Sequence, residues 1–190
     1  MDADAAEKKP ESRQDENRPP WHEVWMILAV NLSWRSRCCR DQVGCVIVTE
    51  DNRVNSASYN GPPPGYTYDT YQEDADGEIQ RVPAVIGSDE DCSHWCPRAM
   101  KPSMEKALDY SDCYSNHAEQ NALVRADFTA ITDGTIYVSS TPCVSCARNM
   151  AASGVARVLF RVDPRRPRDP KAARWFLEAG GVEALIVEDA

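Results

Sequence analysis

The chain has 190 residues, of which 42% are hydrophobic, 27% are charged and 8 are cysteine, and its formal net charge is −9. This length suits one compact domain rather than two, and the acidic balance disfavours nucleic acids as partners, because such binding depends on Lys and Arg that neutralise phosphates. A small nucleotide, held by a few local arginines, is still a possible partner. The eight cysteines, in a chain without a secretory leader, are better interpreted as metal ligands than as disulfides.

Residues 1–20 are predicted to be a disordered, acidic and polar tail. They hold six acids and four bases but almost no large apolar side chain, so they cannot offset the entropy lost on ordering. They lack the apolar segment of a signal peptide, and no run of about 18 apolar residues occurs anywhere in the chain. We therefore expect a cytoplasmic protein with no membrane partner, and a single domain at residues 21–190.

The first half of this domain predicts a helix followed by a hairpin. Apolar residues recur at helical spacing over 21–32, after two prolines. The β-branched run at 43–49 and the return at 53–59 flank a turn, and the Pro/Gly-rich stretch 60–65 ends the pair. Residues 66–116 show no sustained period, which indicates an inserted segment that something must hold in place.

The second half of the domain alternates between segments with the apolar spacing of helices and segments typical of strands. We expect helices at 117–126, from 143 to about 154, and from 169 to about 179; the strands between and after them should lie at 135–139, 155–161 and 182–187. Asp169-Pro170 is a typical helix start, and Gly180-Gly181 a typical stop. This order predicts an α/β fold in which a mixed sheet of about five strands, some of them parallel neighbours, is covered by helices.

Two motifs at helix starts carry the chemistry: His117-Ala118-Glu119 and Pro142-Cys143-Val144-Ser145-Cys146. His117, Cys143 and Cys146 supply three zinc ligands and leave the fourth position open, as a catalytic zinc requires, and Glu119 can handle protons beside it. Taken alone, each motif has a structural interpretation, such as a helix cap or a redox cysteine pair. Taken together, they predict a catalytic zinc site.

H-x-E followed by P-C-x-x-C is the signature of zinc-dependent deaminases. Over residues 21–187 the chain also resembles the deoxycytidylate deaminase family, within the wider cytidine/deoxycytidylate deaminase superfamily. The resemblance rests on RSRCCRDQVG at 35–44, YNGPP at 59–63, HAEQNAL at 117–123 and YVSSTPCVSCA at 137–147. It also rests on the closing helix and strand, from Ala172-Ala173-Arg174 through Gly180-Gly181-Val182. It implies a three-layer α/β/α cytidine-deaminase-like fold. It also implies hydrolytic deamination of dCMP to dUMP by attack of zinc-bound hydroxide on C4, with Glu119 as the proton shuttle.

The resemblance implies roles for further residues. Asn60 is expected to contact the sugar or base, Ser36 with Arg35 to bind the 5′-phosphate, and Tyr137 to lie near the site, although a strand tyrosine is more often part of the core. A second, structural zinc is expected to pin the inserted segment 66–116. Its predicted ligands are Cys38, Cys92, Cys96 and Cys113, with His94 able to replace one of them.

Several alternatives stay open at this point. Cys45 and Ser58 stand where the family usually has a smaller residue, so the substrate can be CMP or a 5-substituted dCMP instead. A nucleic-acid-editing deaminase and a zinc-stabilised binding module without catalysis are alternatives from other classes. The basic loop 163–168 is interpreted as solvated, or as a contact for phosphate or an effector. The resemblance further suggests a homo-oligomer, a hexamer or a dimer, with dCTP and dTTP as effectors.

Overall fold

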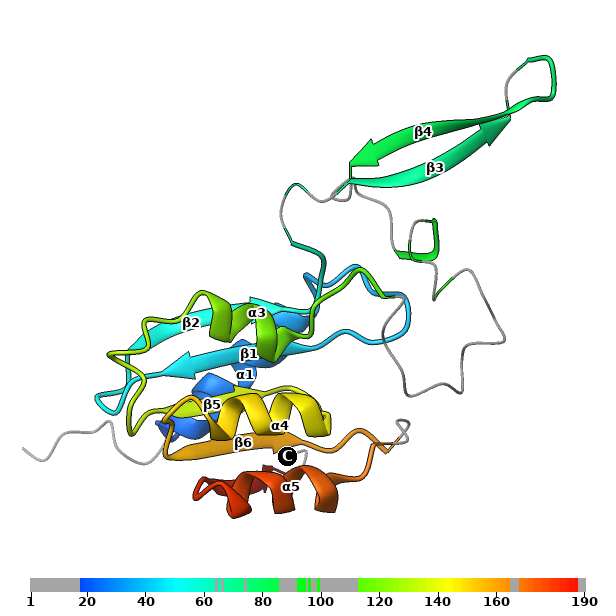
Figure 1. Cartoon of the computed structure of the whole chain (residues 1–190). Helices are drawn as coiled ribbons and strands as arrows, with labels where there is room; N and C mark the ends of the chain where they lie inside the picture. The colour runs from blue at the N-terminus through cyan, green and yellow to red at the C-terminus, as the bar shows by residue number, and fades with distance from the viewer. Residues whose placement is uncertain are drawn as a thin grey trace, which may run out of the picture.

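The structure is a computed structural model (Figure 1), which describes residues 18–63, 65, 67–73, 75–85, 92–94, 96, 99, 113–164 and 168–187. The predicted disordered tail lies outside these residues except for 18–20. Helix α1 spans Trp21–Ser33 and begins directly after Pro20, as the sequence predicts. The backbone N–H groups of Glu23 and Val24 donate to the Pro20 carbonyl and so complete the first turn.

The centre of the domain is a five-stranded sheet with the order β2-β1-β5-β6-β7. These strands span Gly44–Val48 (β1), Val54–Tyr59 (β2), Thr135–Val138 (β5), Arg157–Arg161 (β6) and Glu183–Val187 (β7). β1 is antiparallel to both β2 and β5, whereas β5, β6 and β7 run parallel. The predicted mixed α/β sheet is confirmed.

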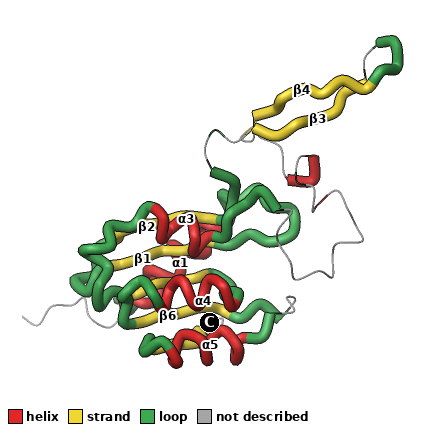
Figure 2. The backbone as a smooth tube through the Cα atoms, in the orientation of Figure 1, coloured by secondary structure: helices red, strands yellow, loops and turns green. Residues whose placement is uncertain are grey.

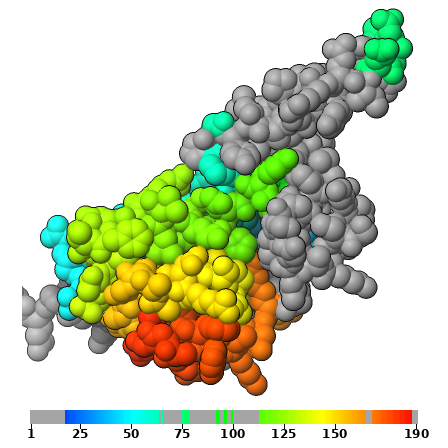
Figure 3. Space-filling model, viewed as in Figure 1, coloured from blue at the N-terminus to red at the C-terminus, as the bar shows by residue number. Residues whose placement is uncertain are grey.

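Helices cover both faces of this sheet (Figures 1 and 2). α1 lies on one face, and the other carries α3 (Ala118–Val124), α4 (Val144–Ala151) and α5 (Pro170–Ala179). These three helices form a continuous layer in Figure 3. The predicted three-layer α/β/α arrangement is therefore confirmed.

Alternation along β1 explains how both faces are filled. Cys45 and Ile47 belong to the core on the α3, α4 and α5 side, while Val46 and Val48 pack with Met26 and Ala29 of α1. All five residues of β1 are buried, as expected for a strand with helices on both sides. β1 is thus the strand that fixes α1 and α3 relative to each other.

Gly44 allows α1 to approach the start of β1. A Cβ at this position would lie 1.9 Å from the Ala29 carbonyl oxygen and 2.8 Å from the Ser33 nitrogen. These contacts are backbone atoms of a packed helix and cannot move aside as a flexible side chain can. A residue without a side chain is therefore required here.

The expectation that residues 66–116 lack a sustained period is wrong over 67–85. Strands β3 (Thr67–Glu73) and β4 (Ile79–Val85) form an antiparallel hairpin that stands apart from the main sheet in Figure 1. Asp76-Gly77 lies in its turn, with Gly77 at a φ of 81°, a conformation that glycine adopts without a steric penalty. Pro83 obscures the pattern, but a proline is tolerated in a two-stranded ribbon because each strand has an unpaired edge.

A short 3-10 turn at Cys92–His94 is the next element after the hairpin. Much of the remaining part of the 66–116 segment lies outside the described residues. Within the described part of the chain, no helix combines the length and the apolar character needed to cross a membrane.

Five connections meet at one edge of the sheet. The parallel strands β5 and β6 end there, β1 begins there and β2 ends there, because β1 is antiparallel to β5 and β2 to β1. The residues that precede α3 join the same edge through a bridge between Gly61 and Asn116. In open α/β sheets, ligands bind beyond the carboxyl ends of the parallel strands, so this edge is where a site is expected.

Candidate active site

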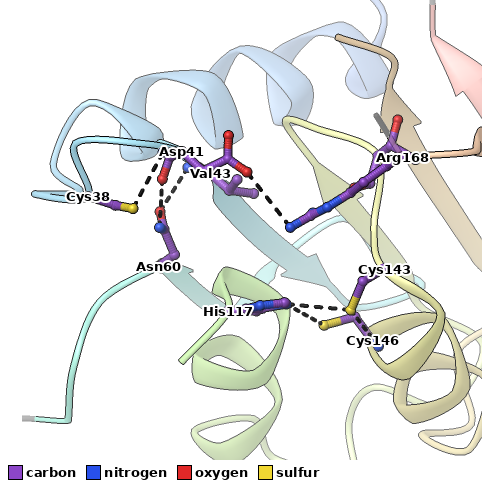
Figure 4. Close-up of polar contacts among 9 residues, drawn as sticks. Cys38, Asp41, Val43, Asn60, His117, Cys143, Cys146 and Arg168 are labelled. Carbon is purple, nitrogen blue, oxygen red and sulfur yellow. Dashed lines mark hydrogen bonds and ion pairs between the residues drawn. The ribbon is translucent and has the colours of Figure 1, made fainter. Parts of the chain in front are cut away.

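Three metal-ligand side chains converge at this edge (Figure 4). The ligand atoms of His117, Cys143 and Cys146 all lie within 4.8 Å of one another. His117 Nδ1 is 3.3 Å from Cys146 Sγ and 3.5 Å from Cys143 Sγ. A tetrahedral zinc at its usual bond lengths separates such nitrogen and sulfur atoms by about 3.6 Å. The three residues therefore fit one zinc ion and leave its fourth position open.

Each ligand is set by the start of a helix. His117 is the N-cap of α3, and its own backbone N–H donates to the Gln120 side chain at 2.9 Å. Cys143 is the N-cap of α4, where its sulfur accepts from the backbone N–H of Cys146 at 3.4 Å. Cys146 follows within the first turn of α4. Free N–H groups at both helix starts favour negatively charged ligand atoms at this point.

The two thiols differ in their affinity for a proton. Hydrogen bonds from Cys146 and His117 outweigh burial and lower the pKa of Cys143 to about 3. The hydrogen bond to the Cys143 thiolate and burial both raise the pKa of Cys146. Bringing both sulfurs to the thiolate form requires a positive charge between them, which a divalent cation would supply. The chemistry of the pair thus agrees with its geometry.

Glu119 is the buried acid beside these ligands. Its side chain is 2% exposed, and its Oε1 atom has no hydrogen-bond partner among the described residues. Burial raises the pKa of this carboxyl group, although the charges of His117 and Arg168 oppose the shift. An unpartnered buried carboxylate oxygen is costly, so this atom is available to an incoming water or substrate. Cys45, fully buried on β1, lies close enough for the Glu119 charge to raise its pKa further, in addition to the larger effect of burial.

Asn121 fixes helix α3 against the end of β2 and was missed by sequence reasoning. Its Nδ2 atom donates to the carbonyl oxygens of Tyr59 and Gly61 at 3.0 and 3.1 Å, and its Oδ1 atom accepts from Asn116 at 3.2 Å. This side chain therefore sets the position of His117 and Glu119 relative to the loop after β2. The signal was present in HAEQN, because a buried polar residue four positions after the histidine needs a partner.

Asn60 lies at the same edge but is strongly engaged by the backbone. Its Oδ1 accepts from the Val43 N–H at 2.8 Å, and its Nδ2 donates to the Asp41 carbonyl at 2.7 Å (Figure 4). An amide keeps one donor and one lone pair beyond these two bonds. The predicted sugar or base contact of Asn60 is thus compatible with its position, but the residue first joins the loop before β1 to the end of β2.

The predicted phosphate residues differ in their surroundings. The Ser36 hydroxyl, on a residue 3% exposed, donates to the Asn60 carbonyl at 2.8 Å and accepts from the Cys38 N–H at 3.2 Å. Arg35 is exposed. The structure therefore brings Ser36 to the site's edge, where its hydroxyl proton is already used within the protein.

Tyr137 is not brought to the other candidates. It packs with Met26, Val46 and Leu159 in the core on the α1 side, whereas its neighbours Ile136 and Val138 face α3 and α4. A position near the site does not fit this orientation, because Glu119 and the three ligands lie on the opposite side of the sheet. The core interpretation of a strand tyrosine holds.

The candidates for a second metal also cluster. Cys92 and Cys96 are buried together, with Cys38 and Cys113 packed against them. Cys92 hydrogen-bonds with Cys38 and with Cys96, and Cys96 with Cys113. Cys39, which was not a candidate, approaches the same group, its sulfur 3.0 Å from that of Cys92. The side chain of His94 lies outside what the structure describes.

Arg168 is a further site residue, which the sequence prediction covered only as part of the basic loop 163–168. Its guanidinium donates to the Thr141 carbonyl at 2.9 Å and lies 3.7 Å from the Asp41 carboxylate. Its charge acts on His117, Glu119 and Cys146. The basic composition of loop 163–168 was the available signal, but only the fold shows that its last residue turns inward.

Comparison with known proteins identifies relatives of this arrangement. The sequence model of the cytidine and deoxycytidylate deaminase zinc-binding region matches residues 19–162. Deoxycytidylate deaminase of Mycobacterium phage D29 is 34% identical over 148 residues, which cover 76% of this chain and 96% of that protein. The Schizosaccharomyces pombe enzyme of the same name is 31% identical over 169 residues, 87% of this chain but 44% of that protein. The human enzyme of that name is 28% identical over 163 residues, which cover 85% of this chain and 76% of that protein.

Solved structures share the fold. The dCMP deaminase of cyanophage S-TIM5, in complex with dCMP and dUMP, has a TM-score of 0.58 and 23% identity over 90% of this chain and 98% of that one. Acinetobacter baumannii RibD has a TM-score of 0.54 and 19% identity over 87% of this chain and 35% of that one.

Proposed function

Because the chain belongs to the cytidine and deoxycytidylate deaminase zinc-binding family, we propose that it is a deoxycytidylate deaminase, which converts dCMP and water to dUMP and ammonia. The observation that carries the proposal is the convergence of His117, Cys143 and Cys146 next to the buried, unpartnered carboxylate oxygen of Glu119. A binding module without catalysis has no use for an open ligand position beside such an acid.

The chain's own residues divide the work of the reaction. His117, Cys143 and Cys146 would hold zinc, which when bound lowers the pKa of water and so supplies a nucleophile near neutral pH. Glu119 accepts a proton from the attacking water and delivers it to ring N3; it then accepts the proton of the hydroxyl group now on C4 and passes it to the departing amine, which leaves as ammonia. A carboxyl group whose pKa is raised by burial suits these alternating roles, because a proton shuttle works best when its pKa approaches the operating pH.

The choice of dCMP rests on the relatives that carry the name deoxycytidylate deaminase. CMP and 5-substituted dCMP stay as alternatives, since Cys45 and Ser58 lie on the strands that border the site. A nucleic-acid-editing activity is disfavoured by the formal net charge of −9. Cytoplasmic localisation, a hexameric or dimeric assembly, and regulation by dCTP and dTTP remain predictions.

We further propose that Cys38, Cys92, Cys96 and Cys113 hold a second, structural zinc, as four thiolates form a closed site. Their clustering supports this ligand set. Metal analysis is expected to give two zinc ions per chain, and one after Cys113→Ala. Cys39→Ala is the matched control and should keep two, because Cys39 lies against the same group without belonging to the proposed set. One zinc per chain in the unaltered protein would contradict this second site.

The main proposal is tested by ammonia release from purified, zinc-loaded protein. The substrates are dCMP, CMP, 5-methyl-dCMP, deoxycytidine and a short single-stranded DNA, with Glu119→Gln as the blank. Preferred turnover of dCMP is the expected result. Preference for CMP or 5-methyl-dCMP would retain the mechanism and change the substrate, whereas turnover of DNA would overturn the charge argument.

A further inference from the structure

Cys39 is the exposed member of the cysteine cluster. All eight cysteines lie in the described part of the chain, and Cys39 alone among them is exposed. Cys92, against which it lies, is 1% exposed. The two sulfurs are 3.0 Å apart, and the Cys39 N–H donates to the Cys92 sulfur at 3.1 Å. A thiol that solvent reaches is therefore in contact with one that solvent does not reach.

Backbone contacts hold the two cysteines in this arrangement. The Cys92 N–H donates to the Arg37 carbonyl at 2.8 Å, so the start of the 3-10 turn is bonded to the residues just before Cys39. A disulfide bond separates two sulfurs by about 2 Å, so the pair needs to approach by only about 1 Å. Formation of this bond therefore requires little movement of the two segments.

The cluster shares a loop with residues that support the active site. The Cys38 N–H donates to the Ser36 hydroxyl at 3.2 Å, and the Cys38 sulfur accepts from the Asp41 N–H at 3.4 Å (Figure 4). The Asp41 carbonyl in turn accepts from the Asn60 amide at 2.7 Å. Loss of a metal ligand from the cluster would thus act on the loop that also positions Asn60.

We propose that Cys39 and Cys92 form a redox pair, whose disulfide takes Cys92 out of the proposed ligand set and releases the second zinc. This inference rests on the proposed structural zinc at Cys38, Cys92, Cys96 and Cys113, and not on the deaminase reaction. A solvent-accessible cysteine next to a second, resolving cysteine is the arrangement of redox sensors. Cys39 is free for this role, because four thiolates already complete a tetrahedral zinc site.

Hydrogen peroxide is the oxidant in this reaction. Its O–O bond breaks as the Cys39 sulfur takes one oxygen, which gives a sulfenic acid and releases water. The Cys92 thiolate then attacks that sulfur: an S–S bond forms, the S–O bond breaks, and the departing hydroxide takes a proton to become a second water. The two sulfurs are oxidised and the peroxide is reduced. Since a zinc ligand must be a thiolate, Cys92 no longer binds the metal.

The test exposes the zinc-loaded, full-length protein to hydrogen peroxide. Peptide mapping by mass spectrometry should find a disulfide that joins Cys39 to Cys92, and a chromophoric zinc chelator should record the loss of one of two zinc ions. Dithiothreitol with added zinc should restore both thiols and the second ion, because thiol–disulfide exchange reverses the bond. Cys39→Ser is the matched variant: it leaves the four proposed ligands intact and should keep both ions under the same treatment.

Other results would overturn the inference. These are a disulfide from Cys38 to Cys39 or Cys92 in place of the proposed one, and equal zinc release from Cys39→Ser and the unaltered protein. Loss of both zinc ions would also overturn it, because oxidation would then not be confined to this pair. If the untreated protein holds a single zinc, the proposed structural site fails and zinc release fails with it, whereas mapping of the Cys39–Cys92 disulfide still tests the redox pair.

Discussion

Asn60 offers a sharp test of how the site is held together. Asn60→Ala leaves the Val43 N–H and the Asp41 carbonyl without the partners they now have at 2.8 and 2.7 Å. An unsatisfied buried donor or acceptor costs about 1–3 kcal/mol, and entry of water into the vacated space recovers part of this cost. We expect a loss of about 2–4 kcal/mol of unfolding free energy, or a fall in Tm of roughly 4–16 °C for a domain of this size.

Asn55 provides the matched control. Its side chain makes the same pair of bonds, accepting from the Asp127 N–H at 3.0 Å and donating to the Asp127 carbonyl at 3.2 Å, but both are exposed. Water can replace them, so Asn55→Ala should cost less than about 1 kcal/mol. Asn60→Asp, nearly the same size as Asn, keeps the bond from Val43 but turns an oxygen toward the Asp41 carbonyl, and should destabilise at least as much as Ala.

The assay is urea unfolding at equal zinc loading, with dCMP turnover measured on the same samples. Equal losses of unfolding free energy for Asn55→Ala and Asn60→Ala would show that burial of the hydrogen bonds does not determine how much stability is lost. Full stability with lost turnover in Asn60→Ala would refute the structural role and leave Asn60 as a substrate contact alone.

Three further changes test the site and its support. Glu119→Gln, isosteric at a 2% exposed position, should lower kcat by about 10²–10⁴-fold with zinc content and unfolding midpoint unchanged; loss of zinc would show instead that Glu119 holds the metal site together. Cys143→Ala should remove one zinc per chain and all activity, and activity that survives would exclude Cys143 as a ligand. Gly44→Ala should destabilise by about 3 kcal/mol or more in chemical unfolding, since its Cβ would meet the Ala29 carbonyl. Gly61→Ala is the control, because its Cβ would come no closer than 3.8 Å to another residue, and it should lower the unfolding free energy by less than about 1 kcal/mol. Equal losses for Gly44→Ala and Gly61→Ala would count against the close approach of α1.

The sequence predicts the layers well because they follow from periodicity. The α1 stripe, the β1–β2 hairpin and the alternation after residue 117 agree with the structure, and differences at the helix ends are a few residues, as where α3 ends at Val124. The hairpin of β3 and β4 was missed because charged residues and Pro83 mask its alternation. Asp76-Gly77 was the local signal that could have revealed it.

The convergence of His117, Cys143 and Cys146 was predictable because each motif is local and lies at a helix start. Arg168 and Asn121 were not, because their roles depend on contacts with residues distant in sequence, such as Thr141 and Tyr59. The orientation of Tyr137 could have been deduced from strand parity: Ile136 and Val138 are apolar and point toward α3 and α4, so the residue between them points toward α1.

The electrostatics of the site give a reason for the inward position of Arg168 in an acidic chain. Two cysteine sulfurs and the Glu119 carboxylate gather anionic atoms at one edge of a protein with a formal net charge of −9. A nucleoside monophosphate brings further negative charge to this edge and would be repelled unless a local cation met it. Arg168 is such a cation at this edge: it lies 3.7 Å from the Asp41 carboxylate and donates to the Thr141 carbonyl at 2.9 Å. One local arginine can neutralise a single phosphate, but the long row of cations that a polynucleotide requires is incompatible with the overall charge.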